Sequence, residues 1–178
     1  MDLSAFFETD GQTQVQKTEE FLAKLDEDGW KRFLSVAQRL VFRANETVVS
    51  QSETSRTFYL VARGRLEVVA KDIQGAVRHV YFIEPLSIFG EQAFFDGHPR
   101  SASVVALTEG ELYGITPDAF EILAVRHPDI ARLALLDLGR ILSLRLREMT
   151  KLALRGRQLG RPVPVKQFHL ARTQTPVR

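Results

Sequence analysis

The sequence predicts an α+β fold, an antiparallel β jelly roll (double-stranded β-helix) flanked by an N-terminal helical segment and a long C-terminal helix. Three observations predict it. Apolar residues recur with helical spacing over residues 18–38, alternate in short β-rich runs over 39–115, and return to helical spacing over 116–155. Short, closely spaced strands separated by turn residues are typical of a sandwich or barrel, and a jelly roll fits their number.

The first part of the chain divides into an arm and two helical pieces. Residues 1–17 are polar and weakly patterned, and we expect a flexible arm there. Acidic residues and a glycine at 26–29 separate the two helical pieces, and Asp28 is a candidate N-cap for the second. Turn residues then punctuate the β-rich runs, which are 39–43, 47–51, 57–62, 65–71, 76–83, 101–107 and 111–115.

Two helices are expected after the strands, because Thr116-Pro117 and His127-Pro128 each place proline at a first helical position. The second helix runs from about Pro128 to Leu154. One of its stripes has steps of three and four residues, which suits a partner helix, so we expect a homodimer through 128–154, with burial against its own domain as the alternative. The stripe comprises Ala131, Leu135, Leu138, Leu142, Arg145, Met149 and Leu152, whereas Ile130, Leu133, Ile141 and Leu144 are expected to cover the barrel.

Composition narrows the classes of protein. The chain has 178 residues, 44% of them hydrophobic and 26% charged, which suits one domain with a sizeable core. The absence of cysteine excludes disulfides, thiolate metal sites and a cysteine nucleophile. No apolar run approaches the ~18 residues of a membrane span, and the N-terminus lacks the pattern of a signal peptide. We therefore expect a cytoplasmic protein.

Charge is distributed unevenly along the chain. Residues 1–150 carry a net charge of −5, whereas 151–178 carry seven basic residues and no acidic one. We expect 156–178 to form a basic, disordered tail. A solvated terminus is the plain interpretation, and contact with nucleic acid, lipid or an acidic protein surface is the alternative.

The chemically informative segment interrupts the strands at 88–103. Gly90 lets the backbone approach a ligand closely, and a short helix is expected to begin near Glu91. The guanidinium of Arg100 can pair with two phosphate oxygens, and Ser101 adds a hydroxyl donor. Glu91 suits a sugar hydroxyl on the same ligand. The alternative is that Glu91 and Arg100 pair with each other in a site that no longer binds anything.

This segment resembles the phosphate-binding cassette of the cyclic-nucleotide-binding domain family, which includes catabolite-activator-type regulators and regulatory subunits of cAMP-dependent protein kinase. The resemblance rests on Phe89-Gly90-Glu91 followed by Arg100-Ser101-Ala102. It extends to a hairpin sequence at 57–68 and to the start of the long helix at 127–130, so that about 20–150 are covered. In the turn at 44–46 the chain has no glycine, although the family often does.

The resemblance implies roles for individual residues. Glu91 would bind the ribose 2′-hydroxyl and Gly90 would supply a backbone contact, while Arg100 would neutralise the cyclic phosphate. Ser101 would hydrogen-bond that phosphate, and it favours cAMP over cGMP. Arg145 falls where activator-type relatives contact adenine with small hydroxyl residues, which leaves the base open. The remaining expected site residues are Phe89, Gln92, Ala93 and Ala102.

These patterns predict a binding protein and not an enzyme, with no catalytic residue, cofactor or metal ligand. The four histidines lack metal-ligand spacing; they are His79, His98, His127 and His169. Too few residues follow Leu154 for a helix-turn-helix domain, so nucleic acid is not an expected partner. We expect a stand-alone sensor of cyclic nucleotides, cAMP above all, that signals through its C-terminal helix, its dimer and a protein partner whose identity the sequence leaves open. The alternatives are a cyclic di-GMP-binding relative of the same fold and a ligand-free dimeric scaffold.

Overall fold

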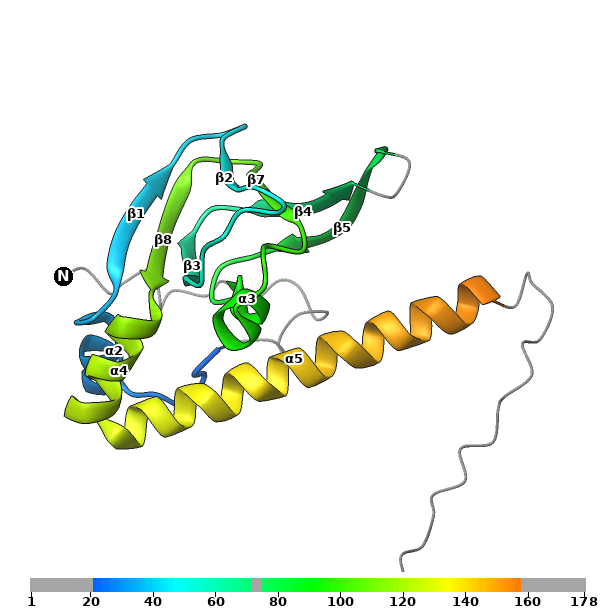
Figure 1. Cartoon of the computed structure of the whole chain (residues 1–178). Helices are drawn as coiled ribbons and strands as arrows, with labels where there is room; N and C mark the ends of the chain where they lie inside the picture. The colour runs from blue at the N-terminus through cyan, green and yellow to red at the C-terminus, as the bar shows by residue number, and fades with distance from the viewer. Residues whose placement is uncertain (1–20, 72–74, 158–178) are drawn as a thin grey trace, which may run out of the picture. The chain divides into compact units, whose positions relative to one another are not determined.

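The computed structural model describes residues 21–71 and 75–157 (Figure 1). The predicted α+β jelly-roll class is confirmed, because the strands form two four-stranded antiparallel sheets with helices beside them. The described elements are α2 (Glu27–Leu34), β1 (Gln38–Phe42), β2 (Thr47–Val49), β3 (Phe58–Arg63), β4 (Leu66–Lys71), β5 (Val77–Ile83), β6 (Ile88–Phe89), α3 (Glu91–Asp96), β7 (Ser103–Ala106), β8 (Gly110–Ile115), α4 (Pro117–Arg126) and α5 (Pro128–Arg157).

The two sheets join strands that are distant in sequence. One has the order β1-β8-β3-β6, and the other has the order β2-β7-β4-β5. Strand β8 pairs with β1 on one side, where Phe42 lies opposite Gly110, and with β3 on the other, where Leu60 lies opposite Tyr113. Strand β6 was not among the predicted runs, since two residues are too few to show alternation.

Strand β3 is buried on both faces and so connects the two cores. Val61 packs between the sheets with residues such as Leu66 and Leu112. Phe58 and Leu60 belong to a second core, which the helices form against the other face of β3 and β8. This two-sided burial explains the nearly continuous apolar run of β3, which alternation alone would not produce.

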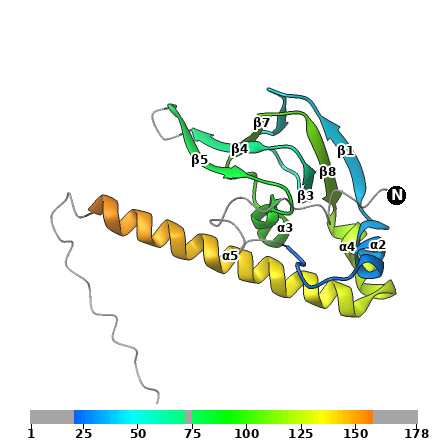
Figure 2. The same cartoon turned by 180° about the vertical axis from the view of Figure 1, so that it is seen from behind.

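Helices α2 and α4 lie side by side at one end of the sheets, as both views show (Figures 1 and 2). Phe33 of α2 is fully buried, and its ring makes edge-to-face contacts with Phe21 at 5.5 Å and with Trp30 at 5.8 Å between ring centroids. The N-cap of α2 is Asp26, whose Oδ1 accepts a hydrogen bond from the Gly29 amide at 2.8 Å. The sequence pointed to Asp28, which is instead inside the helix.

The long helix α5 covers 30 residues and crosses the boundary between two compact units, residues 1–143 and 144–178. The predicted division of its apolar residues was wrong at three positions. Ala131 and Leu138, assigned to a partner helix, are buried in the helical core of the first unit, whereas Leu133 is 41% exposed. Leu135 is 42% exposed, and its assignment to a dimer stays a prediction.

The ends of the chain are only partly described. The predicted arm at 1–17 and the tail beyond 157 lie outside the described residues. The first two residues of the predicted tail, Gly156 and Arg157, belong to α5. None of the helices described here is long and apolar enough to cross a membrane.

Candidate functional site

Two left-handed glycines bound the short helix α3, which follows β6. Gly90 is the N-cap with φ +80°, and Gly97 is the C-cap with φ +69°. Both conformations favour glycine, because a Cβ atom would crowd the backbone there. Gly90 is also closely packed, since a Cβ on it would lie 2.5 Å from Nη1 of Arg100 and 2.9 Å from the carbonyl oxygen of Thr57. Glycine at 90 thus allows the β6–α3 turn to pass directly beside Arg100.

Arg100 is buried, with 4% of the residue exposed, and several hydrogen bonds fix its guanidinium in place. Its Nη1 donates to the carbonyl oxygen of Gly90 at 3.0 Å, while its Nη2 donates to the carbonyl oxygen of Thr57 at 2.6 Å and to Oγ of Ser55 at 3.1 Å. The guanidinium also lies over the ring of Tyr59, 5.7 Å from its centroid. The side chain is therefore preorganised before any ligand arrives.

The charge of Arg100 has no acidic partner among residues 21–71 and 75–157. Its hydrogen-bond acceptors there are two carbonyls and one hydroxyl, all neutral, and its buried Nε has no hydrogen-bond partner. A buried cation is costly unless a negative charge is close to it. None of the hydrogen bonds of Arg100 given above goes to Glu91, the partner that the alternative of a closed Glu91–Arg100 pair requires. The arrangement suits an external anion.

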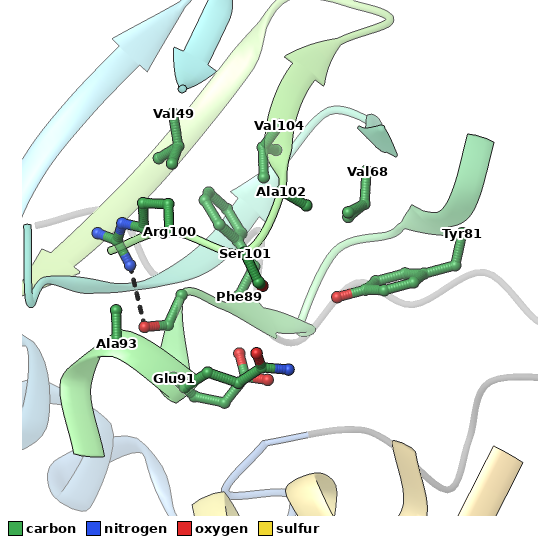
Figure 3. A pocket seen from close by; sticks show the side chains of 12 residues that line it. Val49, Val68, Tyr81, Phe89, Glu91, Ala93, Arg100, Ser101, Ala102 and Val104 are labelled. Carbon is green, nitrogen blue, oxygen red and sulfur yellow. Dashed lines mark hydrogen bonds between the residues drawn. The ribbon is translucent and has the colours of Figure 1, made fainter. Parts of the chain in front are cut away.

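A pocket opens beside Arg100 between α3 and the sheet of β2, β7, β4 and β5 (Figure 3). Its empty volume is about 420 Å³, including the part open to solvent. Apolar side chains of Val49, Val68 and Val104 line one wall, and residues of the 89–102 segment line the other. Figure 3 shows Arg100 at one side of the pocket and Tyr81 at the other, with the Tyr81 hydroxyl directed inward.

Eight of the nine predicted site residues line this pocket, namely Phe89, Gly90, Glu91, Gln92, Ala93, Arg100, Ser101 and Ala102. Glu91, the first residue of α3, is 3% exposed, and it and Arg100 are the buried charged residues of the described chain. The contact of these residues with a ligand stays a prediction. The ninth residue, Arg145, is in the second compact unit, so its predicted contact with a base also stays a prediction.

Sequence reasoning missed three residues of the site. Ser55 and Thr57 hold the guanidinium of Arg100 from more than forty positions away in the chain. Nothing local in the sequence marks them, because one contributes a backbone carbonyl and the other an ordinary hydroxyl. Tyr81 lines the pocket from β5, and its alternation with the buried Ile83 two residues later is the signal that could have placed it on the inner face.

The fold and the pocket together define a jelly-roll domain with a pocket beside a buried arginine, an arrangement that suits an anionic ligand. The chain belongs to the cyclic nucleotide-binding domain family, because the model of that family matches residues 39–127, which is half of the chain. The matched region contains both sheets except for Gln38 at the start of β1, and it also contains α3, Arg100 and α4. The predicted family is thereby confirmed.

Individual relatives fit this assignment. The chain is similar to a cyclic AMP receptor protein of Thermus thermophilus, with 30% identity over 115 residues, 65% of this chain and 51% of the relative. It is also similar to a cAMP-dependent protein kinase regulatory subunit of Aspergillus fumigatus, with 33% identity over 93 residues, 52% of this chain and 22% of that protein. The chain therefore spans about half the length of the first relative and about a fifth of the second.

A solved structure shows the same architecture. The catabolite activator protein of Thermus thermophilus aligns with a TM-score of 0.67 and 28% sequence identity, and the alignment covers 75% of this chain and 62% of that one.

Proposed function

We propose that this protein is a sensor that binds a 3′,5′-cyclic nucleotide, preferentially cAMP, in the pocket beside α3. The observation that carries the proposal is the buried guanidinium of Arg100, which neutral oxygens hold in place and which has no acidic partner among the described residues. A cyclic phosphate would supply the missing negative charge, and charge-assisted hydrogen bonds of this kind are strong.

The remaining site residues divide the ligand between them. The hydroxyl of Ser101 would donate to the phosphate, and the Glu91 carboxylate would accept a hydrogen bond from the ribose 2′-hydroxyl, which a 3′,5′-cyclic phosphate leaves free. The apolar wall of Val49, Val68 and Val104 would pack against the sugar and against the flat face of the base. These are binding roles. We therefore propose a binding protein with no catalytic step of its own, acting in the cytoplasm.

The preference for cAMP draws support from the relatives, whose names refer to cyclic AMP or to a cAMP-dependent kinase. Ser101 in the cassette supports the same preference. Arg145 is proposed to contact the base, and it is the residue through which guanine could be accepted instead.

The output is proposed to travel through α5. Ligand can shift the protein only if it binds one conformation more tightly than another. We propose that binding rearranges α5 and a homodimer formed through 128–154, and that a protein partner detects the change. Leu135 and Leu136, 42% and 61% exposed, are available for the dimer. Saturating ligand should alter hydrogen exchange in α5 and beyond it, and unchanged exchange would contradict this coupling.

Isothermal titration with cAMP, cGMP and cyclic di-GMP tests the binding proposal. Wild-type protein should bind one monocyclic nucleotide with micromolar or tighter affinity, and Arg100→Ala should lose that binding. Arg56→Ala is the matched control, because Arg56 also donates to a backbone carbonyl of the cassette, that of Phe94 at 2.9 Å, but does not line the pocket. It should retain binding.

Two results would change the conclusion. If the wild-type protein binds none of the three nucleotides, the ligand-free scaffold is the better description. If cyclic di-GMP alone binds, the fold is retained and the ligand class changes. Urea denaturation of both variants measures their free energies of unfolding, and so distinguishes a loss of binding from a loss of folding.

A further inference from the structure

Strand β5 contains a β-bulge, and the residues on its two sides pair with β4 in different registers. Val68 of β4 pairs with Tyr81, but the next residue, Val69, pairs with His79, so Val80 is the extra residue. A bulge of this kind redirects the side chains on either side of it. In a regular strand, His79 and Tyr81 would share one face.

The contacts of the two residues show that they occupy opposite faces. His79 Nδ1 lies 2.7 Å from Oε1 of Glu67, and its ring lies 4.4 Å from that of Phe82, on the outer face of the sheet. Tyr81 is opposite Val68, and both line the pocket. Tyr81 keeps the regular pairing that continues from Ile83 opposite Leu66, whereas the bulge turns His79 to the outer face. Tyr81 thus adds an aromatic side chain with a hydroxyl to the valines that line this wall.

Tyr81 has a distinct position among the polar groups of the pocket. Every other polar side chain that lines the pocket comes from residues 91–101, which provide the groups proposed for phosphate and ribose. Tyr81 alone among the lining residues brings a polar group from elsewhere. Figure 3 shows its hydroxyl directed into the pocket from the side opposite Arg100. A nucleotide whose phosphate is held by Arg100 extends its base away from that residue.

We propose that the Tyr81 hydroxyl hydrogen-bonds the edge of the base and is a specificity-determining group of the site. This inference rests on the proposed function. A phenol hydroxyl both donates and accepts, whereas adenine and guanine present different donors and acceptors on their edges. Adenine presents an amino donor where guanine presents a carbonyl acceptor, so the hydroxyl would accept from adenine and donate to guanine. We expect these two hydrogen bonds to differ in strength, so that the hydroxyl contributes unequally to the two nucleotides.

Tyr81→Phe isolates the hydroxyl, since the ring and its packing are kept. Dissociation constants for cAMP and cGMP are measured by isothermal titration for the wild-type protein, Tyr81→Phe and Tyr113→Phe. Tyr113→Phe is the matched control, because it also removes one phenol hydroxyl but lies in β8, away from the pocket. Loss of one neutral hydrogen bond weakens binding by about three- to tenfold.

The ratio of the two dissociation constants decides the question. We expect Tyr81→Phe to weaken binding of the preferred nucleotide by about three- to tenfold and to change the ratio of the cAMP and cGMP dissociation constants by a similar factor. The control, Tyr113→Phe, should bind both nucleotides like the wild type. An unchanged ratio in Tyr81→Phe, whether or not both affinities fall, would overturn the inference and leave the proposed function intact. Absence of any nucleotide binding to the wild type would instead overturn both.

Discussion

Replacing Gly90 with alanine should damage both the stability of the domain and its ligand site. Gly90 has φ +80°, where an L-residue is strained, and its missing Cβ is what allows Arg100 and Thr57 to come close. The added methyl would stand 2.5 Å from Nη1 of Arg100 and 2.9 Å from a backbone oxygen. Atoms cannot approach so closely, so the guanidinium has to leave its position.

The expected size follows from two contributions. The left-handed conformation costs alanine about 1–2 kcal/mol relative to glycine. Displacing Arg100 breaks hydrogen bonds to Gly90 and Thr57, and a hydrogen bond to a charged group is worth roughly 1.5–3 kcal/mol. Because the guanidinium regains some solvent contact when it moves, we expect a total loss of about 3–4 kcal/mol in the free energy of unfolding.

Gly97→Ala is the matched control at the other end of the same helix. Gly97 has φ +69°, but a Cβ there meets nothing nearer than 3.9 Å, at Nε of Arg56. Urea denaturation should therefore show a loss of only about 1–2 kcal/mol for this variant, and titration should show retained nucleotide binding. If both variants lose the same stability and both bind nucleotide, the close packing of Gly90 against Arg100 has no energetic consequence and the reasoning is wrong.

Two further predictions concern the scaffold. The Arg39 guanidinium donates to Glu111 at 2.7 and 2.6 Å, and this hydrogen bonding is the main cause that lowers the pKa of the Glu111 carboxyl. The pair therefore contributes its full stability above the unfolded pKa of about 4.3. That stability is lost as the pH falls through the lower folded pKa. Glu111→Gln should therefore be less stable than wild type at neutral pH and lose less stability below about pH 5; parallel curves of urea midpoint against pH would contradict this. Thr116→Ala removes the Oγ1 that accepts from the Ala119 amide at 3.1 Å, and should cost about 1 kcal/mol in urea denaturation, an effect that an unchanged midpoint would disprove.

What the sequence could reveal was local. Period-two runs marked the longer strands, and Thr116-Pro117 marked the start of α4, because alternation and caps depend on neighbouring residues. The predicted phosphate-binding and ribose-binding groups lie within one segment of fourteen residues, 89–102, and the predicted site residues of that segment line one pocket.

What the sequence could not reveal depends on distant partners. The choice between Ala131 and Leu133 as the buried residue depends on which side of residues 128–143 packs against the helical core of the first unit, and periodicity alone does not specify that side. Ser55 reaches Arg100 only after the chain has folded. Tyr81 shares the inner face of β5 with Ile83, but only the pairing of β4 with β5 and β7 brings that face to the pocket beside Arg100.

The order of the strands within each sheet also governs when the site can form during synthesis. Strand β1 pairs with β8, which is synthesised some seventy residues later, and β2 pairs with β7, which also follows much later in the chain. Long-range pairings of this kind form slowly, since a large loop must close before any contact is gained. A nascent chain that has emerged as far as Arg100 holds the whole cassette but lacks the two strands that complete the sheets. We therefore expect the pocket to be complete only after β7 and β8 have been synthesised, and a chain that stops short of β8 should lack the pairings that hold both sheets together.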